Sequence, residues 1–103
     1  MARWTQSYAD AAKMATVSQQ MPFWGIVVIT TIGGATLEGL VQGLNIGNNA
    51  GAGGVYQYYG ECTIQQKDRT VVTVDFLDIA NVVNVWNAKA AEYEQLGLIK
   101  IIP

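Results

Sequence analysis

The chain has 103 residues, a length that predicts a single domain spanning residues 1–103. Half of the residues are apolar and 14% are charged, which is a high apolar fraction for a small monomer and predicts apolar surface buried between subunits. The net charge of −2 argues against binding nucleic acid by bulk positive charge, and no apolar run reaches the ~18 residues of a membrane span.

An amphipathic helix is predicted over residues 4–20, and Pro22 lies just past its end. Thr5 or Ser7 is expected to cap its start. Its apolar stripe is predicted to dock against the rest of the domain and consists of Trp4, Tyr8, Ala11, Ala12 and Ala15.

A strongly bent hairpin is predicted next. Ile26–Ile29 is rich in β-branched residues, as in a strand, and Gly33-Gly34 is typical of a tight hairpin turn. The returning strand, residues 36–44, contains Gly39 and Gly43. Glycine inside a strand marks a sharp bend or a close backbone approach, so the pair predicts a strand that coils enough to close a small barrel over residues 25–86.

Three further strands are expected after an uncharged loop at residues 46–54. This loop lacks the lysine of a P-loop and the following helix of a dinucleotide site, so we reject both interpretations. The strands, predicted from apolar and polar alternation, are residues 55–66, 70–76 and 79–86, with a short break at Leu77-Asp78 between the last two. Residues 87–103 are predicted to form a helix over 88–96, capped by Asn87 and ended by Gly97, and then an apolar tail over 98–102.

The residue types leave little room for catalysis. Histidine is absent, and Asp75 and Asp78 are too few ligands for a cation. The single Cys62 is expected to be a small core residue in a reducing compartment, and the first twelve residues lack the apolar segment of a secretory leader. We therefore expect a cytoplasmic protein that is not an enzyme, binds no metal or cofactor and does not insert into a membrane.

The order of elements resembles that of Sm and Sm-like (LSm, Hfq-type) proteins over about residues 5–86. In the first Sm motif, Gly34 and Gly39 match the two glycines, and Val41 and Leu44 match the two apolar positions. Asn49 matches the motif's Asn, and Asn45 stands in place of its Asp. The second motif keeps its apolar frame, but Asp75, Phe76 and Asp78 occupy its Arg, Gly and Asn positions. The chain also resembles short acidic Sm-like proteins attributed to marine phages (cyanophages). An unrelated SH3-like barrel is the alternative.

The resemblance implies a mainly β fold: a small, strongly bent five-stranded antiparallel Sm-like (SH3-like) barrel with an N-terminal α-helix and a short C-terminal helix and tail. It also implies a homo-oligomeric ring of about five to seven subunits, in which the fourth strand of one copy pairs with the fifth of the next. Both strands lack the Lys or Pro that usually protects an edge. The candidate interface residues are Val71, Val72, Val74, Val82, Val83 and Val85.

Binding of single-stranded RNA is the family function that the resemblance implies. In this chain Gly47 holds the base-stacking position, and Asp75, at the Arg position, repels phosphate. The candidate RNA-binding residues are Asn45, Asn48, Asn49, Phe76 and Asp78; for Phe76 we favour a role in the subunit interface. Two functions remain open: weak, RNA-chaperone-type binding of single-stranded RNA with altered specificity, or a scaffold ring that binds other proteins, encoded by a phage and located in the cytoplasm of its bacterial host.

Overall fold

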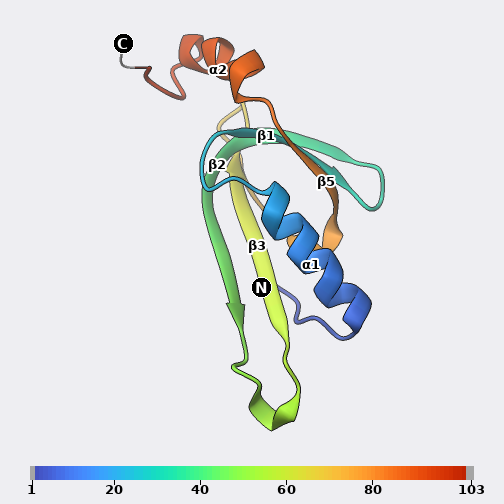
Figure 1. Cartoon of the computed structure of the whole chain (residues 1–103). Helices are drawn as coiled ribbons and strands as arrows, with labels where there is room; N and C mark the ends of the chain where they lie inside the picture. Colours follow the sequence, from blue (N-terminus) through green and yellow to red (C-terminus); the bar gives the residue numbers. More distant parts are fainter. Residues whose placement is uncertain (1, 102–103) are drawn as a thin grey trace.

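The computed structural model describes residues 2–101, and these form a five-stranded antiparallel sheet with one helix packed across it and a second helix beyond one end of it (Figure 1). The strand order is β4-β3-β2-β1-β5. The elements in chain order are helix α1 (Tyr8–Gln20), strands β1 (Ile26–Thr31) and β2 (Thr36–Asn48), the 3₁₀ turn η1 (Ala52–Gly54), strands β3 (Tyr58–Gln65) and β4 (Val71–Asp75), the 3₁₀ turn η2 (Phe76–Asp78), strand β5 (Ile79–Asn84) and helix α2 (Trp86–Gln95). The predicted order of a helix, five strands and a second helix is confirmed.

Strand β2 bends so far that its two halves have different partners. Its residues 36–40 pair with β1, and residues 40–48 pair with β3. A Cβ on Gly39 would lie 2.7 Å from the carbonyl oxygen of Gln65, so the predicted close backbone approach is confirmed there. At Gly43, by contrast, no atom of residues 2–101 would lie within 4 Å of an added Cβ, so the backbone makes no close approach there. Gly43 instead follows a register shift after Val41, and this bulge brings Leu44 onto the core face.

The second half of β2 and the start of β3 extend beyond their neighbours as a long arm (Figure 1). The molecule is correspondingly elongated, with extents of 50 × 27 × 21 Å. Because β2 continues to Asn48, the connecting loop covers residues 49–57 and not the predicted 46–54, and β3 begins at Tyr58 and not at Val55.

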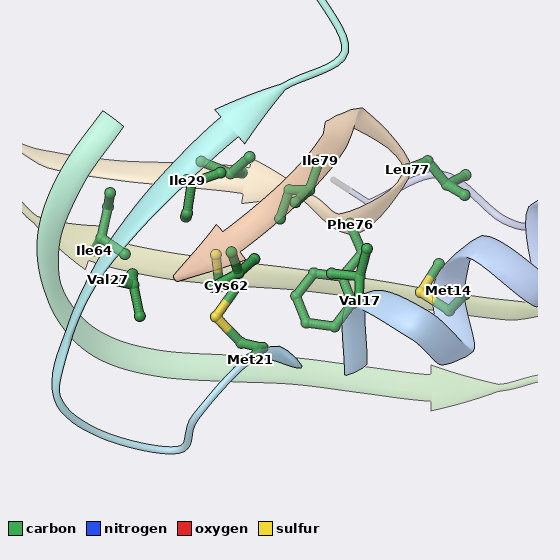
Figure 2. Packing of buried hydrophobic residues seen from close by; sticks show 12 residues of the cluster. Met14, Val17, Met21, Val27, Ile29, Cys62, Ile64, Phe76, Leu77 and Ile79 are labelled. Atoms are coloured by element: carbon green, nitrogen blue, oxygen red, sulfur yellow. The ribbon is translucent and has the colours of Figure 1, made fainter. Parts of the chain in front are cut away.

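The main core lies between the curved sheet and α1 (Figure 2). Met14, Val17 and Met21 reach into it from the helix and from its end. The predicted docking stripe is wrong, because Ser7 caps the helix by accepting a hydrogen bond from the backbone N–H of Asp10, and Trp4 therefore lies outside the helix. The helix is rotated so that its longer apolar side chains face the sheet, and Tyr8 remains 90% exposed. Tyr8 and the helix alanines line an open apolar groove of about 380 Å³ together with Ile46 and Tyr58.

A second, smaller core joins α2 to the sheet through Ile26, Leu40 and Tyr93. The helix begins at Trp86, whose N–H donates to the side chain of Asn84, so the predicted cap at Asn87 is wrong. Gly97 ends the helix region with φ of +76°, as expected. Of the predicted apolar tail, Leu98 and Ile99 pack on this second core, and Ile102 lies outside the described residues. No helix within residues 2–101 is long and apolar enough to cross a membrane.

Candidate functional site

Within residues 2–101, the two end strands of the sheet, β4 and β5, each pair with one neighbouring strand. In an antiparallel pair, backbone groups face the partner at every second residue. The bond from Gln66 N–H to the Thr70 carbonyl directs residues 70, 72 and 74 toward β3, so the backbone groups of Val71 and Thr73 face outward. On β5, the hydrogen bond from Val85 N–H to the Ile26 carbonyl likewise means that the backbone groups of residues 82 and 84 face outward.

The valines predicted to form a subunit interface differ in burial. Val71 is 58% exposed and Val83 is 47% exposed, so both side chains remain free to contact another copy. Val74 and Val82 are buried in the core of a single chain, which makes their side chains unsuitable for the predicted interface role. The backbone groups of Val74 also face β3, whereas those of Val82 face outward. Val72 and Val85 are half-buried against the two cores.

The asparagines at the tip of the β2–β3 arm are used by the loop itself. The Asn49 amide nitrogen donates to the Val55 carbonyl at 2.8 Å, and its oxygen accepts from the N–H groups of Gly51 and Gln57, both at 3.0 Å. The side-chain oxygen of Asn48 accepts from Ala50 N–H at 2.8 Å. Both ends of the Asn49 amide are therefore engaged, and a base would have to displace these bonds.

The η2 turn carries the residues at the second-motif positions. Asp75 accepts from the N–H of Leu77 and from the N–H of Arg3, the latter at 2.7 Å. The Arg3 guanidinium also pairs with Asp78 at 2.5 Å. A residue near the start of the chain thus supplies a guanidinium beside the position where the family motif has its Arg. Phe76 is fully buried, so its predicted roles in base stacking and in the subunit interface are both wrong.

A pocket of about 240 Å³ lies where the N-terminal segment meets β2 and β3. Thr5 places this segment, since its N–H donates to the Tyr58 carbonyl at 2.8 Å and its hydroxyl accepts from Tyr58 N–H at 2.9 Å. Trp4 then contacts Tyr59 edge to face, with ring centroids 5.0 Å apart. Asn45 and Glu61 are opposite each other in the sheet register and complete the lining together with Ala2.

The structure does not gather the predicted RNA-binding residues in one place. Asn45 lines the Trp4 pocket, Asn48 and Asn49 belong to the tip of the arm, and Asp78 belongs to η2. Sequence reasoning missed Arg3, Trp4 and Glu61. The adjacent Arg3 and Trp4 were the one signal in the sequence for the first two, but Trp4 was assigned to the predicted helix over residues 4–20, and nothing in the sequence singled out Glu61.

A charged cluster ties α2 to the sheet. The Tyr93 hydroxyl donates to Glu38 at 2.9 Å, and Lys67 contacts both Glu38 and Glu92. Burial and the Glu38 carboxylate raise the pKa of Tyr93 above its ordinary value, and the hydrogen bond to Glu92 raises the pKa of Lys67. Within residues 2–101, no group of three or more His, Cys, Asp or Glu side chains is arranged to hold a metal ion.

Comparison with solved structures identifies the class of fold. The protein XC5848 from Xanthomonas campestris, described as adopting a novel variant of Sm-like motif, resembles this chain with a TM-score of 0.55 and 14% identity, over 82% of this chain and 94% of that chain. The chain therefore has an Sm-like fold. No family model and no curated protein matches its sequence. The likeness gives no support to a phage origin.

Proposed function

We propose that this protein assembles into a closed homo-oligomeric ring of about five to seven copies, with β4 of one copy paired to β5 of the next. Among the described residues, the outward backbone groups of both strands have no strand partner. The exposed Val71 and Val83 side chains add apolar surface to these edges. An edge of this kind is either paired or prone to aggregation, and a head-to-tail pairing repeats until the ring closes.

We further propose that the ring is a cytoplasmic scaffold for protein partners. The observation that carries this choice is the η2 turn, where two carboxylates stand at the positions that hold Arg and Asn in the family motif. The guanidinium of Arg3 is already shared between Asp75 and Asp78, which leaves it little capacity for a phosphate. With a net charge of −2 on each copy, a ring would repel RNA more strongly than a single chain does.

The ring is tested by removing one outward N–H from β4. Thr73→Pro removes an outward donor and leaves the β3–β4 bonds in place, since proline is tolerated on an edge strand where its missing N–H would face solvent. We expect wild-type protein to sediment at five to seven times the 11.1 kDa of one chain, and Thr73→Pro to sediment as a monomer.

Two further variants sharpen this test. Thr73→Val removes the hydroxyl, which lies 3.2 Å from that of Thr63, but keeps the N–H, so the ring should persist. Val71→Lys adds a charge on the edge at a position that is 58% exposed, so it should dissociate the ring without unfolding the chain. A monomeric wild type, or rings that survive both Thr73→Pro and Val71→Lys, would refute the assembly.

Weak binding of single-stranded RNA is the second candidate function, and one observation favours it. The rings of Trp4 and Tyr59 lie beside the Asn45 amide, a combination that stacks on and hydrogen-bonds to unpaired bases. Filter binding with oligo(U) and oligo(A) at several salt concentrations distinguishes the two functions. The scaffold predicts no retention at physiological salt, whereas RNA binding predicts retention that weakens as salt rises. If RNA instead binds at Asn49, the residue at the Asn position of the first Sm motif, Asn49→Ala should weaken RNA binding and leave the assembly intact.

A further inference from the structure

We propose that the pocket formed by Trp4, Tyr59, Asn45 and Glu61 binds an arginine side chain of a partner protein. This inference rests on the proposed scaffold function and names the chemistry by which the scaffold would recognise its partner. The pocket volume of about 240 Å³ suits one extended side chain.

The pocket is built on one face of the arm. In the sheet register Asn45 is opposite Glu61, and Gly47 is opposite Tyr59. A Cβ on Gly47 would lie 2.6 Å from the Tyr59 ring, so glycine at this position lets the ring lie against β2. Trp4 then approaches Tyr59 with an interplanar angle of 77°, and the two rings together form an aromatic wall. Aromatic surfaces of this kind attract guanidinium groups.

The polar groups of the pocket have more capacity to accept hydrogen bonds than to donate them. Glu61 receives one long bond, from the Asn45 amide at 3.3 Å, and Asn45 in turn receives a 3.4 Å bond from the Tyr59 hydroxyl. These bonds are longer than the usual 2.7–3.2 Å range. An ionised carboxylate has about four acceptor positions, so most of those on Glu61 remain available.

The charges around the pocket favour a cation. Glu61 forms no ion pair within residues 2–101. Arg3, which lies between the lining residues Ala2 and Trp4 in the sequence, forms ion pairs with Asp75 and Asp78. Asp75 is opposite Glu61 in the β3–β4 register. A phosphate-bearing ligand would meet these carboxylates, whereas a guanidinium would compensate Glu61. Arginine suits the site better than lysine because its planar fork pairs with a carboxylate and stacks on an aromatic ring.

The test titrates the full-length protein with a capped Gly-Gly-Arg-Gly-Gly peptide and follows the indole N–H signals by NMR. We expect the Trp4 signal to shift and the signals of Trp24 and Trp86, which contact each other elsewhere, to remain as internal controls. The same peptide with neutral citrulline in place of arginine should bind at least about tenfold more weakly, because it lacks the charge that pairs with Glu61.

Glu61→Gln is the decisive variant, since it keeps the shape of the pocket and removes its charge. We expect it to weaken arginine binding about tenfold or more, while Glu94→Gln, an acidic residue on α2 outside the pocket, leaves binding unchanged. Oligonucleotides that shift the Trp4 signal, with binding strengthened by Glu61→Gln, would overturn the proposal in favour of RNA. Equal binding of the arginine and citrulline peptides, or no binding of either, would also overturn it.

These outcomes are separable from those of the ring. Every lining residue of the pocket comes from one chain, so peptide binding is measurable on the monomeric Thr73→Pro variant as well as on the wild type. A ring that forms but does not bind the peptide refutes only the arginine site. A wild-type protein that is monomeric but binds the peptide refutes only the ring.

Discussion

Gly60→Ala is predicted to destabilise the protein by about 1–3 kcal/mol through overpacking. The added Cβ would lie 2.6 Å from Cδ2 of Phe76 and 3.0 Å from the sulfur of Met14. The Phe76 ring is fully buried, so it has no solvent to move into, and Met14 is held on α1 beneath the sheet. Gly60 has no left-handed φ, so the cost comes from packing and not from backbone strain.

Gly43→Ala is the matched control, because no atom in the described part of the chain would lie within 4 Å of its Cβ and the glycine also lacks a left-handed φ. It should be neutral, or stabilise the protein by up to about 1 kcal/mol by restricting the unfolded chain. Urea unfolding of both variants and wild type at one protein concentration measures the difference, since assembly makes stability depend on concentration. Equal midpoints for Gly60→Ala and Gly43→Ala would refute the packing of Phe76 against β3.

Two further predictions concern the buried side chains of Tyr93 and Cys62. Tyr93→Phe removes the hydroxyl that donates to Glu38 and should cost about 1–2 kcal/mol, at the lower end for a charged acceptor because Lys67 still contacts Glu38; an unchanged urea midpoint would contradict this. Burial raises the pKa of Cys62 from 9.0 to about 11, so the stability that the neutral thiol contributes is complete below pH 9 and lost as the pH rises toward 11. Wild type should therefore lose more stability than Cys62→Ala between pH 8 and pH 11, and parallel pH profiles would show that the thiol is not buried.

The parts of the fold that the sequence predicted correctly depend on local patterns. The alternation of Gly60, Cys62 and Ile64 along the third strand predicted their common face, and all three are buried. The close backbone approach at Gly39 was also predictable, because glycine inside a strand commonly marks a bend or a close approach. The bulge after Val41 was not predicted, because a glycine inside a strand, such as Gly43, can mark a bend, a close backbone approach or a bulge and does not distinguish among them.

The candidate sites were less predictable, because their geometry depends on contacts across the whole chain. Apolar periodicity extended naturally from the helix back to Trp4, and nothing local indicated that Thr5 would bond to Tyr58. That pairing decides where Arg3 and Trp4 lie. The prediction for Phe76 failed for a related reason: alignment to the family motif gives a position but not a burial, and Gly60 provides space for the ring inside the core.

The N-terminal segment and α1 also define the limits of the two free edges. At the end of β4, Asp75 is held by the N–H and guanidinium of Arg3, so among the described residues the open part of this edge is centred on Val71 and Thr73. On β5, the outward N–H of Val82 donates to the side chain of Gln20 at the end of α1. A neighbouring β4 must therefore displace one exposed glutamine side chain from β5, and β4 itself ends at Asp75, where the η2 turn begins. Short, bounded edges admit few registers, and a single register is what a head-to-tail contact needs in order to close into a ring of uniform size.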